Sequence, residues 1–417
     1  MASERRRDPS PARPPDGVDG GGPNLTSSVT AAAVLVTLRA LYRLRVHGSV
    51  PRRPVPTLVI ANHQHDIESL FVPAILYTRG GRRRSVCSVA SQRLLEPWFL
   101  ASRVPAVFAP LAARVPLGRL MARVGMMPLE NEPRHRALAS LAAEVMANHG
   151  DLPVTTVFTP EALRLLGPGG SHGRLSRLTS SALARAATVS VGLQALRQPW
   201  RGEVHQRTRE RIDRQIEAIE ARLRAGATVF LTPEGRVTRD GRLGPMRLVL
   251  GRLLPLADEV VLAASSLDSF ASRRLSEVVR FALPARGVGI ATALAAARPV
   301  TLSQLLAVAI GADAAGPVPS AVTAEALTDA VRRQLRSLPK TVFVDPWLRP
   351  GRLAHEVRHA LGTMTAVGLL ARRQDGYVRI GTGRDARLPG IDDAFAFHRT
   401  VLCETCAAAE RVAHVGA

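Results

Sequence analysis

The chain has 417 residues, of which 46% are hydrophobic and 22% are charged. This length predicts about two or three domains with a sizeable core, and the composition excludes global disorder and collagen-like structure. The chain has 56 Lys and Arg residues and 34 Asp and Glu residues, which gives a formal net charge of +22. Such a charge favours anionic partners such as lipid surfaces, nucleic acid or phosphorylated substrates.

Two further features of the composition narrow these classes. Aromatic residues make up only 4% of the chain, which argues against a base-stacking platform for nucleic acid. Lys340 is the only lysine, so the excess of arginine indicates a biased genome and is a weak argument for nucleic-acid binding. The three cysteines form no disulfide framework, which favours a reducing compartment.

The N-terminal region is predicted to contain a tail and a helix. Residues 1–24 are rich in Pro, Gly, Asp and Arg and are expected to be a disordered basic tail, without the apolar core of a signal peptide. Residues 25–50 are expected to form an amphipathic helix, which either packs on the domain or lies in a membrane interface with its arginines on lipid phosphates. The helix is too short and too charged to span a bilayer.

Residues 51–340 are predicted to form the main domain, in which short apolar runs alternate with helical patterns. This alternation implies an α/β fold with a mixed, mainly parallel sheet covered by helices. A stretch at about 151–205 breaks the alternation and is expected to be a helical insertion. The predicted strands are Thr57–Ala61, Ser85–Ala90, Gly125–Leu129, Ala227–Leu231, Glu259–Ala264 and Glu277–Leu283. The predicted helices are Glu68–Thr78, Arg134–Asn148 and Arg209–Ala225.

Residues 341–417 are predicted to form a small C-terminal α+β unit. Leu353–Leu370 has a helical pattern and Leu370–Ile380 that of a hairpin with an Asp-Gly turn, so the unit resembles a winged helix. Cys403 and Cys406 form a C-x-x-C pair within a continuous helical pattern. We expect buried helical cysteines there and no metal site, because a zinc site normally has four ligands.

The first candidate for chemistry is the polar segment Asn-His-Gln-His-Asp-Ile-Glu at 62–68, directly after the apolar strand 57–61. Ligands bind at the carboxyl ends of strands in a parallel sheet. If the turn folds back, Glu68 reaches one imidazole nitrogen of His63, and the other nitrogen can take a proton from an alcohol. His65 and Asp66 offer a second pair, although sequence neighbours rarely face each other.

The second candidate is the segment Thr-Pro-Glu-Gly-Arg at 232–236, which follows the strand ending at Leu231. The loop also carries Arg239 and Arg242, and such a loop can present N–H groups and guanidinium groups to a phosphate. An ordinary basic surface loop is the alternative interpretation when this segment is taken alone.

Together, the two segments resemble the glycerolipid acyltransferase family. That family carries Asn-His-Gln-Ser with an aspartate five residues after the histidine; Asn62, His63 and Gln64 match, and Glu68 replaces the aspartate. The family also carries Phe-Pro-Glu-Gly-Thr-Arg, which is similar to residues 232–236 here. The resemblance spans about residues 26–285. Its departures are the longer acidic side chain, the displaced arginine and a proline missing from Val260–Ser265.

The resemblance implies direct acyl transfer from an acyl-CoA or acyl-carrier-protein thioester to a phospholipid or lysophospholipid acceptor, without another cofactor or a metal. His63 would be the general base and Glu68 would orient it, with backbone N–H groups near Gly235 as oxyanion donors. Further residues would bind the acceptor. These substrate-binding residues are Glu234, Gly235, Arg236, Arg239 and Arg134. The apolar stretch Leu94–Leu111 is expected to form either an acyl groove or ordinary core helices.

The expected location is the cytoplasmic face of a membrane, as a peripheral protein on an anionic surface. Two other classes stay open at this stage. One is a catalytically inert membrane-surface protein on the same fold, and the other is a basic nucleic-acid-binding protein. For the acyltransferase itself, no nucleic acid is expected as a partner. The phosphate loop of nucleotide-binding proteins is absent from the sequence.

Overall fold

The computed structural model describes most of the chain. Predictions for the 1–24 tail, for Leu94–Leu111 and for Arg134 concern positions outside the described residues. The described residues are 25–50, 53–65, 68–80, 85–91, 121–122, 124–130, 136–166, 173–179, 189–311 and 321–416.

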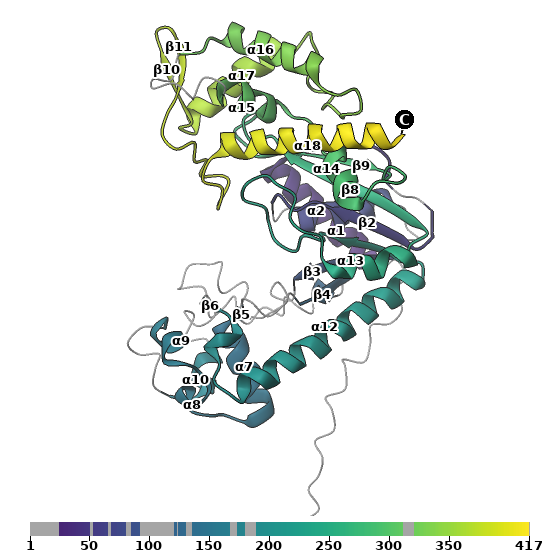
Figure 1. The fold of residues 1–417 in the computed structure, drawn as a ribbon, viewed down its shortest axis with the longest axis vertical. Coiled ribbons are helices and arrows are strands. Elements are labelled where there is room, and N and C mark those ends of the chain that lie inside the picture. Colours follow the sequence, from purple (N-terminus) through teal and green to yellow (C-terminus); the bar gives the residue numbers. More distant parts are fainter. Residues whose placement is uncertain are drawn as a thin grey trace, which may run out of the picture.

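A seven-stranded sheet lies at the centre of the described chain, with the strand order β1-β9-β8-β2-β7-β3-β4 (Figure 1). Neighbouring strands in it are parallel except for the antiparallel pair β8 and β9. The predicted α/β class with a mixed, mainly parallel sheet is therefore confirmed. The strands are β1 (Arg43–His47), β2 (Thr57–Ala61), β3 (Val86–Ser91), β4 (Met126–Leu129), β7 (Thr228–Leu231), β8 (Glu259–Leu267) and β9 (Ser276–Ala282).

Both faces of the sheet are covered, which explains why the central strands are apolar throughout. In β2, Val59 and Ala61 face a core shared with α1 (Leu25–Leu41) and α2 (Glu68–Arg79). Leu58 and Ile60 face the opposite core. That second core contains side chains of α12 (Trp200–Arg224), α13 (Leu248–Leu253) and α14 (Ile290–Ala297).

The predicted N-terminal helix at 25–50 is too long. Helix α1 ends at Leu41, and Arg43–His47 forms the edge strand β1, which pairs with β9 in parallel register. The physical reason is the alternation of apolar Leu44 and Val46 with Arg43, Arg45 and His47, which points to opposite sides of a strand. Leu44 and Val46 pack on the core shared with α1 and α2, and all five residues of β1 are half-buried. Arginines every second residue are thus a strand pattern here rather than the polar face of a helix.

A mostly helical lobe lies apart from the sheet and is joined to it by α12 (Figure 1). Its core already includes α7 (Leu138–His149), so it begins before residue 151. The 25 residues of α12 span about 37 Å; its first turns pack in this lobe and its last turns pack under the sheet. The other elements of the lobe are α8 (Val154–Val157), α9 (Pro160–Arg164), α10 (Leu175–Thr179), η2 (Leu193–Ala195), and the two-residue strands β5 (Arg136–Ala137) and β6 (Ser190–Val191).

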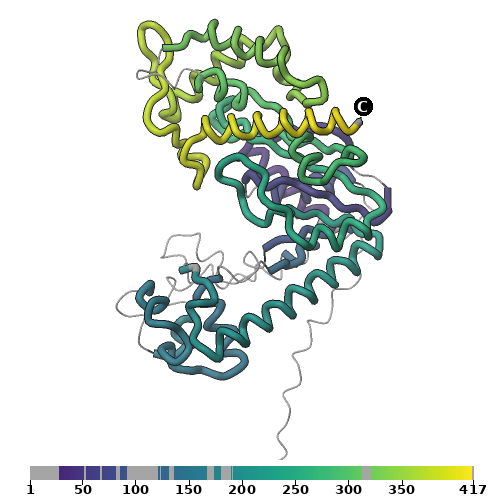
Figure 2. Tube along the Cα trace, viewed as in Figure 1, coloured from purple at the N-terminus to yellow at the C-terminus, as the bar shows by residue number. Residues whose placement is uncertain are grey.

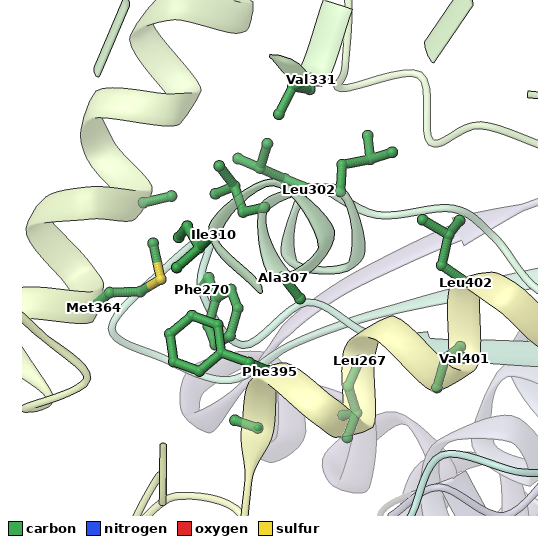
Figure 3. Packing of buried hydrophobic residues seen from close by; sticks show 14 of the residues in the cluster. Leu267, Phe270, Leu302, Ala307, Ile310, Val331, Met364, Phe395, Val401 and Leu402 are labelled. Atoms are coloured by element: carbon green, nitrogen blue, oxygen red, sulfur yellow. The ribbon is translucent and has the colours of Figure 1, made fainter. Parts of the chain in front are cut away.

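The C-terminal lobe lies at the other end of the molecule (Figure 2). Its apolar core joins residues of the β8–β9 loop, such as Phe270, to Phe395 of α18 and Met364 of α17 (Figure 3). The predicted hairpin is confirmed, but its turn residues are Gln374 and Asp375 and not the expected Asp-Gly pair, because Gly376 already pairs with Arg373. The elements are α15 (Leu302–Gly311), α16 (Ala324–Ser337), α17 (Leu353–Ala366), β10 (Leu370–Arg373), β11 (Gly376–Arg379) and α18 (Ala394–Gly416).

Helix α18 contains the C-x-x-C pair, as the continuous helical pattern predicts. Cys403 is exposed and Cys406 is half-buried, so the expectation of buried cysteines is wrong for Cys403. Between them, Glu404 accepts a hydrogen bond from Arg298 at 2.7 Å and another from the backbone N–H of Leu243 at 3.0 Å. The segment therefore ties the C-terminal helix to the loop after β7.

We expect Glu404→Ala to destabilise the protein, because it leaves the fully buried guanidinium of Arg298 without its carboxylate. Removing one partner of a buried ion pair costs about 3 to 5 kcal/mol, and we expect about 2 to 3 kcal/mol here because Glu404 is 27% exposed. Urea unfolding of the full chain measures the change. Glu410→Ala, at an exposed position of the same helix, is the control, and equal stability of the two variants would contradict the prediction.

Candidate active site

The two sequence segments that resemble the acyltransferase motifs lie side by side at one edge of the sheet. Strand β2 is hydrogen-bonded in parallel to both β7 and β8, with Ile60 opposite Leu231 and Leu262. The loop after β2 carries His63, and the loop after β7 carries Glu234. Because adjacent parallel strands end at the same edge, the register alone brings the two loops together.

His63 and Glu68 form the predicted pair. Nδ1 of His63 lies 3.1 Å from Oε2 of Glu68, which confirms that the turn folds back onto the start of α2. The Glu68 side chain is fully buried and that of His63 is 12% exposed. A carboxylate on Nδ1 fixes the ring orientation and stabilises the charged imidazolium when it forms.

The Glu68 carboxylate is held by further donors. Its oxygens accept the backbone N–H of Gln64 at 2.9 and 3.0 Å, and Oε1 accepts the hydroxyl of Ser265 at 2.7 Å. Ser265 in β8 is in turn fixed by Asn62, whose side-chain oxygen accepts its N–H at 2.7 Å and whose side-chain nitrogen donates to its carbonyl at 3.0 Å. Glu68 is thus immobilised from both sides, and the imidazole with it.

Glu234 does not point away from the sheet as a free acceptor-binding group. It is 4% exposed, and its two oxygens accept the N–H of His63 at 2.8 Å and the N–H of Gly244 at 2.6 Å. Burial raises the pKa of Glu234 to about 7, although the N–H groups of Gly244 and His63 favour the carboxylate and the charge of Glu68 opposes it. The Glu234 carboxylate thus holds the backbone N–H of His63.

The rest of the 232–247 loop folds over this carboxylate. The N–H of Thr238 donates to the carbonyl of His63 at 2.9 Å. Gly235 has φ +65°, a backbone conformation that residues other than glycine rarely adopt, and the guanidinium of Arg247 lies against it. The N–H of Gly235 donates to the carbonyl of Thr232 at 3.1 Å, so Gly235 itself is not the expected oxyanion donor.

The other predicted site residues lie around this centre. Arg236 and Arg239 are exposed, and Arg239 lies close to Gly390 of the C-terminal lobe. Of the second predicted pair, the ring of His65 lies 6.1 Å from that of Tyr42, and Asp66 is outside the described residues. The site therefore brings together His63, Glu68 and Glu234, with Arg236 two positions after Glu234.

One acidic residue of the site was not anticipated. Glu277 on β9 is 1% exposed, and neither of its oxygens accepts a hydrogen bond from a described donor. Burial raises its pKa well above the ordinary value, and the nearby charge of Glu68 raises it further. Because a second negative charge beside Glu68 is costly in a buried site, the protonated form of Glu277 is favoured. The only signal in the sequence is a glutamate inside an otherwise strand-like run.

No model of a known protein family matches the chain, and no curated protein matches it. Within the described residues, no group of three or more His, Cys, Asp or Glu side chains is arranged to hold a metal ion. The site is therefore interpreted from its own residues.

We expect Glu277→Gln to stabilise the protein, and increasingly so as the pH rises from mildly acidic to neutral. In the native state Glu277 holds a proton that the unfolded chain releases above an ordinary pKa of 4.5, so the native state binds more protons and wild-type stability falls with pH. This term reaches about 1.4 kcal/mol for each pH unit and is absent from the glutamine variant.

Urea unfolding of both proteins at several pH values measures the difference in free energy of unfolding. Glu325→Gln, at an exposed position of α16, is the control. A difference between wild type and Glu277→Gln that is the same at every pH would contradict a protonated Glu277.

Proposed function

We propose that the protein is an acyltransferase, which moves a fatty acyl group from a CoA or carrier-protein thioester to a hydroxyl of a phosphorylated, glycerolipid-type acceptor. The observation that carries the proposal is the hydrogen bond between His63 and Glu68, immobilised next to the Pro-Glu-Gly loop. A histidine oriented by a buried carboxylate is the arrangement that general-base catalysis on an alcohol requires. The motif resemblance supplies the substrate class.

The proposed reaction passes the acyl group directly from donor to acceptor. When Nδ1 of His63 donates to Glu68, the neutral ring carries its lone pair on Nε2. Nε2 removes the proton of the acceptor hydroxyl while the oxygen attacks the thioester carbonyl carbon. The tetrahedral intermediate then collapses, the C–S bond breaks, and the leaving thiolate takes the proton from the imidazolium. Glu68 stabilises that imidazolium throughout.

The negative oxygen of the intermediate requires hydrogen-bond donors. The backbone N–H groups of Arg236 and Val237 directly follow the left-handed turn at Gly235, and neither donates to another residue of the described chain. We assign the oxyanion to these two groups, which are N–H groups near Gly235 as the sequence analysis expects. The guanidinium of Arg236 would bind the phosphate of the acceptor.

The catalytic pair is tested with labelled acyl-CoA and a panel of acceptors. We expect His63→Ala to lower kcat by about 10²- to 10⁴-fold, and Glu68→Gln by about 10²-fold or more, because each removes general-base catalysis. His149→Ala is the matched control, since His149 forms a similar pair with Glu203 at 2.8 Å in the helical lobe. Wild-type protein that transfers no acyl group to any acceptor would instead support a catalytically inert protein on this fold.

The phosphate contact is tested with two acceptors that differ only in the phosphate. We expect Arg236→Ala to raise the KM for lysophosphatidate by about tenfold or more, the usual effect of losing a charge-assisted hydrogen bond, with no effect on monoacylglycerol. Arg242→Ala, at an exposed position of the same loop, is the control. A larger effect of Arg239→Ala would assign the phosphate to Arg239.

A further inference from the structure

A basic pocket lies outside the motif segments, between the N-terminal elements and the C-terminal lobe. Its volume is about 560 Å³. The walls come from the end of α1, the start of β1, the loop between β8 and β9, and α17. The lining residues are Arg39, Tyr42, Arg43, Ser272, Arg273, Arg274, His359, Gly362 and Thr363.

The four arginines of this pocket are not neutralised by acidic partners. Arg43 stacks on the ring of Trp347 at 4.3 Å, and Arg274 donates to the carbonyl of Ala40 at 3.0 Å. Within the described residues, neither of them forms an ion pair with a carboxylate, nor do Arg39 and Arg273. Four guanidinium groups around one pocket repel each other unless an anion binds, and phosphate is an anion that their planar donor groups match.

By contrast, buried arginines nearby are paired. Arg45, two residues along β1 from Arg43, contacts both Asp268 and Asp345. Arg387 contacts Asp385 at 2.7 Å. The lack of acidic partners is thus a property of the pocket and not of this region of the protein.

The pocket lies at the same edge of the sheet as His63. Strand β1 begins next to the start of β9, where Arg43 is paired with Ser276. Strand β9 is antiparallel to β8, so the start of β9 lies beside the end of β8 at Leu267. Strand β8 runs parallel to β2, so the pocket and the loop after β2 share one edge. Tyr42 connects them, because its ring lies 6.1 Å from that of His65.

Helix α1 presents an apolar stripe to solvent next to this pocket. Its inner face, with Ala31, Leu35 and Leu38, packs against α2. On its outer side Val29 is 61% and Val36 is 69% exposed. A helix that is apolar on both faces is normally buried on both, so the outer stripe indicates a second apolar environment. The stripe consists of Val29, Ala32, Ala33, Val36, Ala40 and Leu41.

We propose that this arginine pocket binds the phosphate of an anionic glycerophospholipid at a membrane surface, while the outer stripe of α1 lies among the lipid headgroups. An apolar stripe flanked by arginines is the pattern of an interfacial helix, and the arginines supply charge complementarity to the lipid phosphate. None of the described helices is both long and apolar enough to cross a bilayer. The inference rests on the proposed function only in explaining why the protein would bind lipid. Lipid binding itself can be measured without acyl transfer.

The test is co-sedimentation of the full chain with vesicles of phosphatidylcholine alone or mixed with phosphatidylglycerol. We expect wild type to bind the mixed vesicles, and Arg39→Glu with Arg273→Glu to weaken this binding by about 25-fold or more, since each basic residue near an anionic surface contributes about fivefold. The matched control is Arg333→Glu with Arg336→Glu, which makes the same charge change at exposed positions of α16. Val29→Ser with Val36→Ser is expected to weaken binding without a change of charge.

Several outcomes would overturn the inference. One is equal loss of binding in the pocket variant and the α16 control, which would indicate attraction by net charge alone. Another is binding of free CoA or inorganic phosphate that is lost in the pocket variant while vesicle binding is unchanged, which would assign the pocket to a soluble phosphate.

The two proposals fail separately. His63→Ala is expected to bind mixed vesicles as wild type does. If wild type transfers no acyl group but its vesicle binding depends on Arg39 and Arg273, the proposed function fails and the lipid site stands. If transfer is observed and the pocket variant binds vesicles normally, the lipid site fails and the acyltransferase stands.

Discussion

The two hydrogen bonds accepted by Glu234 hold the site together. One oxygen binds the N–H of His63 after β2 and the other binds the N–H of Gly244 in the loop after β7. A buried carboxylate is costly unless its oxygens are satisfied, so both loops must be in place at once. The backbone of His63 is therefore fixed before its side chain is considered, and only the orientation of the ring is left to Glu68.

Three buried acids gather at this edge of a protein with a net charge of +22, and each is accommodated in a different way. Glu234 is satisfied by backbone N–H groups, Glu68 by the imidazole, the N–H of Gln64 and the hydroxyl of Ser265, and Glu277 by keeping its proton. Replacing buried charged groups by apolar residues of the same shape is often neutral or stabilising. Such a costly concentration of titratable groups is typical of a site that moves protons.

The sequence predicts the part of the site that is local. The apolar run 57–61 followed by polar residues predicts β2 and its functional end, and the spacing of His63 and Glu68 predicts their hydrogen bond. It does not predict Ser265 or Glu277, which are about 200 residues further along the chain and reach Glu68 only through strand order and register. The end of α1 was missed for a related reason, because an alternation of two apolar residues is too short to outweigh a preceding helical pattern.

The C-terminal lobe is connected to the same loops, which links the proposed lipid pocket to the proposed reaction. Glu404 of α18 holds the N–H of Leu243, one residue before the Gly244 that Glu234 binds. Arg45 of β1 contacts Asp268 in the β8–β9 loop and Asp345 in the C-terminal lobe. The pocket walls and the loop carrying His63 are thus parts of one hydrogen-bonded body. A phospholipid bound in the pocket would therefore orient the whole edge of the sheet toward the membrane, where an acceptor with its hydroxyl at the headgroup level would approach His63 from the lipid side.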